Sequence, residues 1–185
     1  MPIKVKEVIR LAAELVGRSD LAAEAEKESS LKEELLLFLH CFNLVENEIA
    51  LDYFPLKRRE TLLPENGKLL YTQFSEAPVS VLKVTDTRAH GLPFEAFPTH
   101  LDVKGYHGEV AVSYAYAPRE KGIADDSDLG GRISARLIAY GAAAEFLLAT
   151  GRFSEAATFD KKYREALVAA NNVRRRLLIR GRRWA

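Results

Sequence analysis

The helical pattern of this chain is interrupted by a long segment of different periodicity, and this interruption most constrains the fold. Apolar residues repeat at spacings of three and four up to about residue 51, and helical spacing returns after the segment DDSDLGG at 125–131. Between residues 53 and 118 the spacing alternates instead, and prolines and glycines recur. Because alternation is typical of half-buried strands, the sequence predicts a β block inserted into a helical fold.

Three helices are predicted before the interruption. Residues 3–16 carry one apolar stripe, and Gly17 is suited to end that helix. Ser19 is suited to cap a short polar helix over about residues 20–28. A third helix over about residues 31–51 is apolar around so much of its circumference that we expect it at the centre of the fold.

The β block carries its own signals. Residues 79–85 and 109–116 alternate, and Glu-Asn-Gly at 65–67 is typical of a hairpin turn. These patterns predict a small antiparallel β subdomain of roughly five or six strands.

Helical spacing then resumes in the segment ISARLIAYGAAAEFLLATG, which ends at Gly151. Ser154 is suited to cap a last helix over about residues 155–178. The chain is therefore predicted to be an α+β protein, a helical bundle with an inserted small antiparallel β subdomain. Its predicted parts are N-terminal helices over 1–52, the β insert over 53–118, C-terminal helices over 119–173, and an Arg-rich tail over 174–185.

Charge is unevenly spread along the chain. The net charge is +1, but residues 171–185 hold six arginines and no acidic residue. The other 170 residues hold 21 basic and 26 acidic groups, a net charge of −5. A uniformly basic nucleic-acid binder does not have this distribution, whereas an acidic body with a cationic tail favours contacts from tail to body or from tail to partner. Outside the tail, the sequence suggests no stripe of basic residues.

Patterns for catalysis or metal binding are weak. The histidines lack the spacing of a helical metal site, although three histidines and two aspartates of the β block are candidates to meet there: His90, His100, His107, Asp86 and Asp102. His40 and Cys41 are neighbours on a helix and point about 100° apart, so we expect them to pack in the core rather than to form a nucleophile pair. We predict no catalysis, no cofactor and no metal site.

Two further groups have structural interpretations. The acidic run Asp125, Asp126 and Asp128 lacks the spacing of a calcium loop, so we expect these carboxylates to cap the helix after Gly131. A smooth helical surface is expected around Gly141, and it suits close packing within the fold or between subunits. The residues we assign to subunit packing are Tyr140, Gly141 and Ala144.

No basic-then-apolar leader and no apolar run of membrane-spanning length are found, so we expect neither a secretion signal nor a membrane contact. The tail has three interpretations: docking on a protein, contact with nucleic acid, or a disordered end. A tryptophan one residue from the end favours an anchor in a partner's pocket. The predicted docking residues are Arg174, Arg175, Arg176, Arg180, Arg182, Arg183 and Trp184.

The segment IAYGAAAEFLLATGRFSEAATFDKKYREAL at 138–167, followed by the Arg-rich ending, resembles the C-terminal part of the head–tail connector proteins of tailed phages and prophages. These proteins are also called adaptor, neck or head-completion proteins. The segment NEIALDYFPL at 47–56, which leads from a long helix into the β block, is similar to the same group.

The resemblance implies a structural protein of the virion neck, made in the bacterial host cytoplasm. It implies a homo-oligomeric ring, twelve copies in the assembled virion, with the free protein a ring or a monomer. The C-terminal tail would dock on the portal protein, the β block would face the next tail or neck protein, and DNA would pass through the channel without sequence-specific binding. The alternatives are a nucleic-acid-binding protein that uses its basic tail, and a small enzyme that uses the β-block histidines.

Overall fold

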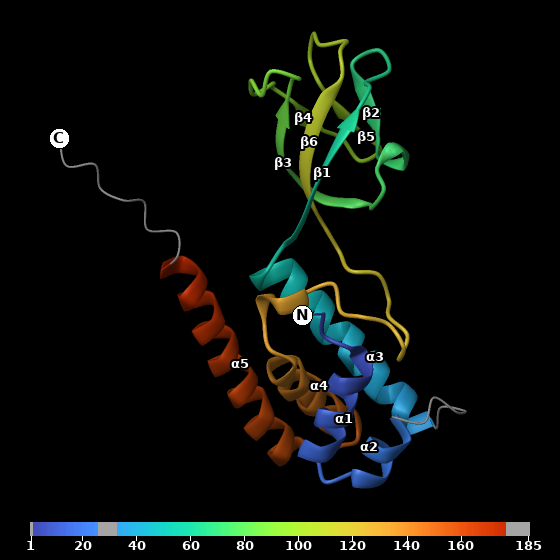
Figure 1. Cartoon of the computed structure of the whole chain (residues 1–185), viewed down its shortest axis with the longest axis vertical. Coiled ribbons are helices and arrows are strands. Elements are labelled where there is room, and N and C mark those ends of the chain that lie inside the picture. Colours follow the sequence, from blue (N-terminus) through green and yellow to red (C-terminus); the bar gives the residue numbers. More distant parts are fainter. Residues whose placement is uncertain (1, 26–32, 177–185) are drawn as a thin grey trace, which may run out of the picture. The chain divides into compact units, whose positions relative to one another are not determined.

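The computed structural model describes residues 2–25 and 33–176 of the chain. Within these ranges the fold is α+β, with five α-helices and two small three-stranded antiparallel sheets inserted between α3 and α4 (Figure 1). The predicted fold class is therefore confirmed. The chain divides into a helical unit, Met1–Phe54 with Arg119–Ala185, and a β unit, Pro55–Pro118.

The helical unit is built from elements on both sides of the insertion. In the described ranges they are α1 Val5–Leu15, α2 Ser19–Ala25, α3 Glu33–Glu48, the π-helical turn η1 Ile49–Tyr53, the 3-10 turn η3 Gly130–Arg132, α4 Ala135–Ala149 and α5 Phe153–Arg176.

The end of α1 follows from its glycine. Gly17 has a φ of +79°, in the left-handed region that other residues rarely adopt. Its N–H donates to the Glu14 carbonyl (3.1 Å), and the Arg18 N–H donates to the Ala13 carbonyl (2.8 Å). This pair of bonds is the Schellman motif, which satisfies carbonyls that the helix end leaves without partners. The prediction that Gly17 ends this helix is confirmed.

The central helix of the unit is α4, so the prediction that the helix over residues 31–51 is central was wrong. Helix α4 packs against α1, α3 and α5. Helix α3 and the turn after it leave Leu36, Leu44 and Leu51 between 42% and 48% exposed. The physical reason is side-chain size: the alanines and the glycine of α4 let α1, α3 and α5 approach it closely, whereas one side of α3 stays exposed although α1, α2 and α4 pack against the helix.

Close packing at Gly141 joins the helices on the two sides of the insertion. A Cβ atom at Gly141 would lie 2.7 Å from Val45 Cγ1 on α3 and 3.0 Å from Tyr163 Cε2 on α5. Nearby, the rings of Phe38 on α3 and Phe146 on α4 stack with centroids 3.9 Å apart. Helices that are distant in sequence are therefore held together by direct side-chain contact.

The helix starts differ in part from the sequence predictions. The N-cap of α4 is Ser134, whose hydroxyl accepts a hydrogen bond from the Leu137 N–H at 3.2 Å. Helix α5 already begins at Phe153, so Ser154 lies inside the helix rather than at its cap. The 3-10 turn over residues 130–132 separates Asp125, Asp126 and Asp128 from the start of α4, so they do not cap it.

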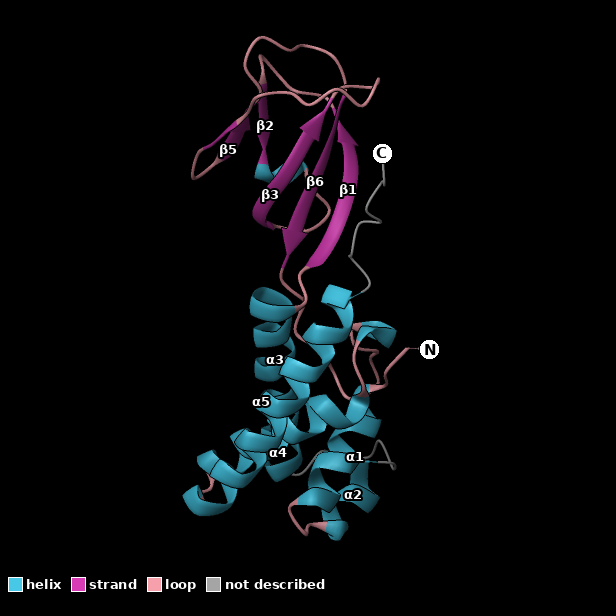
Figure 2. Cartoon of the chain, turned by 90° about the vertical axis from the view of Figure 1, so that its left-hand side faces the viewer, coloured by secondary structure: helices cyan, strands magenta, loops and turns pink. Residues whose placement is uncertain are grey.

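The β unit contains two small sheets, which Figure 2 shows with their strands in magenta. The sheets have the orders β1-β6-β3 and β2-β5-β4, and all pairings are antiparallel. The strands are β1 Leu56–Leu62, β2 Lys68–Leu70, β3 Pro78–Thr85, β4 Glu95–Ala96, β5 His100–Asp102 and β6 Val110–Tyr116, with the 3-10 turn η2 Tyr71–Gln73 after β2.

The turn before β2 and the core of this unit agree with the sequence pattern. Asn66 and Gly67 both have positive φ, as a two-residue type I′ turn requires. Tyr114 is fully buried, and Phe74 packs edge-on against its ring at 5.1 Å. The β unit therefore has a hydrophobic core of its own, formed by Leu69, Phe74, Val84, Leu101, Val103, Val110, Val112 and Tyr114.

We predict that Gly141→Ala lowers the free energy of unfolding by about 1–2 kcal/mol, although alanine is the better helix former. The added methyl group has no room against Val45 and Tyr163. Urea denaturation followed by circular dichroism measures the effect. In a Val45→Ala background the same substitution should cost less, because the closest contact is then removed and only the Tyr163 ring remains near the added methyl group. An increase in stability from Gly141→Ala alone would contradict the packing argument.

Candidate functional site

The predicted docking residues lie at the end of the described residues and beyond it. Arg174, Arg175 and Arg176 form the last turn of α5. The remaining predicted residues, Arg180, Arg182, Arg183 and Trp184, lie outside the described residues. The docking role of the tail therefore stays a prediction.

The residues predicted for subunit packing lie on α4. Gly141 and Ala144 are buried within the chain, and the close contact at Gly141 is made with α3 and α5 of the same chain. This geometry fits the intramolecular alternative. Tyr140 is partly exposed; its hydroxyl accepts a hydrogen bond from Arg136 Nε at 2.8 Å, and Lys162 Nζ lies 5.9 Å from the centre of its ring. A role between subunits stays a prediction, for which Tyr140 alone of the three offers exposed surface.

Two of the three β-block histidines, His90 and His100, have local partners. His90 Nδ1 lies 3.1 Å from Asp86 Oδ2, and the ring of His100 stacks on Phe97 with centroids 4.9 Å apart. In residues 2–25 and 33–176, no group of three or more His, Cys, Asp or Glu side chains is arranged to hold a metal ion. An enzyme built on these residues gains no geometric support from the described part of the chain.

Cys41 and His40 have different surroundings. Cys41 is buried on α3, and burial raises the pKa of its thiol to about 12, which disfavours the reactive thiolate. His40 is exposed on the same helix, so the prediction that both residues pack in the core was wrong for His40. The reason is the roughly 100° rotation between helical neighbours, which places one side chain inward and the next outward.

The acidic residues of the segment before α4 bind that segment to its surroundings. Asp125 Oδ2 accepts from the Gly122 N–H at 2.7 Å, and Asp128 Oδ2 lies 2.7 Å from Lys121 Nζ. Asp126 forms a backbone bridge with Lys4. The prediction that these residues cap the following helix was wrong, because each is used to fold the connecting segment itself.

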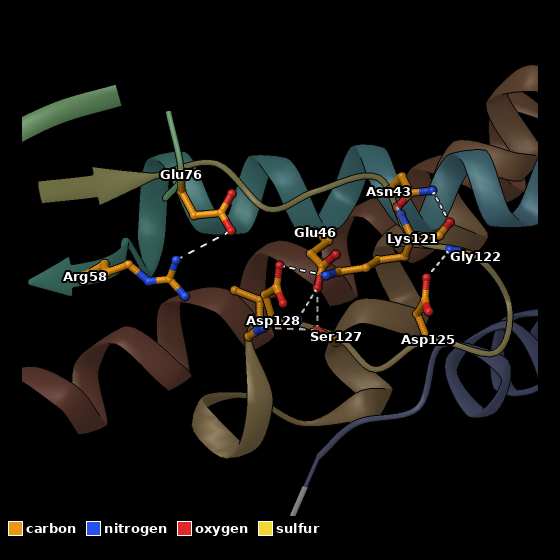
Figure 3. A network of polar contacts seen from close by, with 10 residues as sticks. Asn43, Glu46, Arg58, Glu76, Lys121, Gly122, Asp125, Ser127 and Asp128 are labelled. Carbon is orange, nitrogen blue, oxygen red and sulfur yellow. Dashed lines mark hydrogen bonds and ion pairs between the residues drawn. The ribbon is translucent and has the colours of Figure 1, made fainter. Parts of the chain in front are cut away.

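A buried glutamate on α3 holds the same segment. Glu46 is fully buried, and its Oε1 accepts from the Ser127 hydroxyl at 2.6 Å and from the Asp128 N–H at 2.9 Å. Figure 3 shows the Glu46 carboxylate facing this segment, with Asn43 further along α3. Asn43 exchanges two hydrogen bonds with the Lys121 backbone. These contacts fasten the chain to α3 soon after it leaves the β unit.

Only one of the two oxygens of the Glu46 carboxyl group accepts hydrogen bonds from described residues. Its Oε2 is buried without a hydrogen-bond partner among the described residues. Burial raises the pKa of Glu46, while the bonds from Ser127 and Asp128 and the charge of Lys121 act in the opposite direction. A neutral Glu46 is therefore favoured over a wider pH range in the folded protein than in the unfolded chain.

A cationic face on the sheet β1-β6-β3 is the feature that sequence reasoning missed. Arg59 on β1 and Lys83 on β3 both stand opposite Ser113 of the central strand β6, and Lys57 is two residues from Arg59 on the same face. All three cations are exposed, and none makes an ion pair with a described residue. The expectation that basic residues outside the tail form no stripe was wrong, since strand pairing brings together residues that the sequence separates.

Arg58, between these two cations in sequence, belongs to the other face of the sheet. Its guanidinium lies 3.6 Å from Glu76 (Figure 3). It also lies 3.8 Å from Glu60 and 5.6 Å from the centre of the Tyr116 ring. The alternation of β1 could have revealed this division, because Lys57 and Arg59 share a face and Arg58 does not.

We predict that the free energy of unfolding of Glu46→Gln increases, relative to that of the wild type, as the pH rises. Because the pKa of Glu46 is raised in the folded state, the stability contributed by its neutral form is present below the ordinary glutamate pKa of about 4.3 and is lost as pH rises through the native pKa. The loss is about 1.4 kcal/mol for each unit by which the two pKa values differ, and glutamine does not titrate. Urea denaturation at several values from pH 4 to 8 measures the difference. A difference that stays constant or reverses with pH would contradict a raised pKa.

In the described ranges, no helix combines the length and the hydropathy that crossing a membrane requires.

Comparisons with known proteins give no assignment. No protein-family profile matches the chain, and its sequence matches no curated protein.

Proposed function

We propose that the protein is a structural head–tail adaptor of a tailed phage or prophage. In this proposal, copies of the chain form a ring beneath the portal, and the C-terminal tail of each copy docks on it. The ring provides the platform for the next neck or tail protein and a passage for DNA. The protein performs no catalysis.

The observation that carries the proposal is the way the β unit interrupts the helical unit. The β unit is inserted between α3 and α4, and the last helix, α5, leads directly into the arginine-rich end. Helices, a β insertion, helices and a cationic end follow one another in the same order in the connector proteins that the sequence resembles. This support comes from architecture and order along the chain, and it identifies no individual contact with a portal.

Charge distribution supports a tail that docks on a protein. Residues 1–54 hold six basic and eleven acidic residues, so the negative charge of the body is concentrated in this part of the sequence. The cationic tail is attracted to an acidic surface on a partner. Arginine in particular binds carboxylates with two parallel hydrogen bonds. Many weak tail contacts around a ring would add up to tight binding.

The alternative function is nucleic-acid binding through the basic tail. The cationic sheet face gives this alternative some support that the sequence alone did not offer. Binding to phosphates would fall steeply with salt, as a straight line in a log–log plot. Such a slope, measured for binding to duplex DNA, would mark the nucleic-acid function.

We predict that the full-length protein binds the portal protein of its own phage in multiple copies, and that a version ending at Asn172 does not. The truncation removes all six arginines of the tail and Trp184. Pull-down with mass measurement of the complex is the test. A matched control replaces only those six arginines by lysine, which keeps the charge and removes the paired hydrogen bonds, and we expect it to bind at least about tenfold more weakly.

If both versions bind the portal equally, the tail is not the docking element. If neither binds it while the full-length protein binds duplex DNA at low salt, the adaptor proposal is wrong and the nucleic-acid function takes its place.

A further inference from the structure

Two exposed faces of this chain have complementary chemistry. The first is the outer face of the sheet β1-β6-β3, here called the sheet face. The second is the solvent side of α3 and η1, here called the α3 face.

The sheet face carries cations on its two edge strands and small side chains on the central strand β6. Lys57 and Arg59 stand on β1 and Lys83 on β3, opposite small side chains of β6 such as Ser113. Two irregularities in β3 add aliphatic groups beside these cations, since Val79 is 57% and Leu82 46% exposed at the register shifts. This face is therefore suited to a partner that carries both acidic and aliphatic groups.

The α3 face has the opposite charge and the same apolar character. Leu36 and Leu44 are eight residues apart, which places them within about 80° of each other around the helix, and Leu51 continues the row in the turn that follows. All three leucines are more than 40% exposed. Helix α3 contains no lysine or arginine, and its first residue, Glu33, is an exposed acid.

Acidic residues stand at both ends of this leucine row. Glu33 lies in the first turn of α3 and Asp52 in η1. Both are exposed, and no hydrogen bond or ion pair joins either of them to another described residue. The α3 face therefore presents aliphatic groups, with the exposed His40 among them, between two carboxylates that are available to a partner.

We propose that the sheet face of one copy binds the α3 face of a second copy. Exposed aliphatic side chains on each face are removed from water by the other, and Lys57, Arg59 and Lys83 meet the carboxylates of Glu33 and Asp52. Because the two faces differ, the contact is heterologous, and repeating it leads from copy to copy and closes a ring if the rotation allows. The inference rests on the proposed function for the ring and names the contact between its subunits.

A second copy suits the sheet face better than nucleic acid does. Phosphates would satisfy the three cations but would leave Val79 and Leu82 in water. Proteins that bind single strands place aromatic rings under the bases, whereas the sheet face presents Lys57, Arg59, Lys83 and aliphatic or small side chains. The mixture of charge and aliphatic surface is typical of a contact between proteins.

The test reverses the charge of each face separately in the full chain. Variant K57E/R59E/K83E makes the sheet face acidic, and variant E33K/D52K makes the α3 face basic. Self-association is measured by sedimentation velocity over a range of concentrations up to about 1 mM. Each variant alone should associate at least roughly tenfold more weakly than the wild type, because like charges then face each other.

Mixing the two variants gives the decisive result. In a one-to-one mixture, the acidic sheet face of one variant meets the basic α3 face of the other, and the remaining faces are as in the wild type. Association should return to within about threefold of the wild type, which also shows that both variants fold. The matched control K68E/R88E/K104E changes the net charge of the β unit by the same amount elsewhere, and it should associate like the wild type.

Three results would overturn the inference. One is a wild-type protein that stays monomeric over the whole concentration range. Another is a mixture that associates no better than its components. The third is a sheet-face variant that keeps wild-type self-association but loses binding to duplex DNA, which would assign this face to nucleic acid. The portal pull-down is independent of all three, so the adaptor proposal is judged separately.

Discussion

The helical unit depends on the close approach of α3, α4 and α5 at Gly141. The insertion separates α3 from α4 along the chain, so their pairing rests on side-chain contact rather than on a short connection. Gly141 admits the methyl groups of Val45 on one side and the ring of Tyr163 on the other. The stacked rings of Phe38 and Phe146 add a second contact between α3 and α4. An interrupted bundle of this kind tolerates an insertion because its core is formed without it.

The polar contacts around Glu46 complete this arrangement. The chain returns from the β unit along α3, where Asn43 and Glu46 bind its backbone and the hydroxyl of Ser127. The same segment contacts the N-terminus, since the Ser127 N–H donates to the Ile3 carbonyl at 2.8 Å. A buried carboxyl group with one oxygen unpartnered is destabilising as an anion. The hydrogen bonds that Glu46 makes fix the path of this segment along α3, at a cost in the free energy of unfolding.

Sequence patterns predicted the architecture better than the surfaces. Alternation and turn residues located the β unit, and the Asn66-Gly67 turn and the Gly17 helix end follow from backbone sterics that only a few residues satisfy. Burial was harder to predict, because a leucine-rich helix such as α3 and an alanine-rich helix such as α4 differ in how closely neighbours can approach, which periodicity does not report. The cationic sheet face and the Glu46 contacts join residues distant in sequence, so they required the strand pairing and the packed helices. The docking role of the tail, on which the adaptor proposal depends, remains a prediction from sequence.

The central claim is that copies of this chain form a ring attached to the portal by their C-terminal tails. Electron cryomicroscopy of the protein assembled with its portal tests this claim most directly. The account predicts a closed ring in which residues 174–185 of each copy contact the portal and the sheet face of each copy lies on α3 of its neighbour. Copies bound singly, or a ring whose C-terminal tails lie away from the portal, would contradict it.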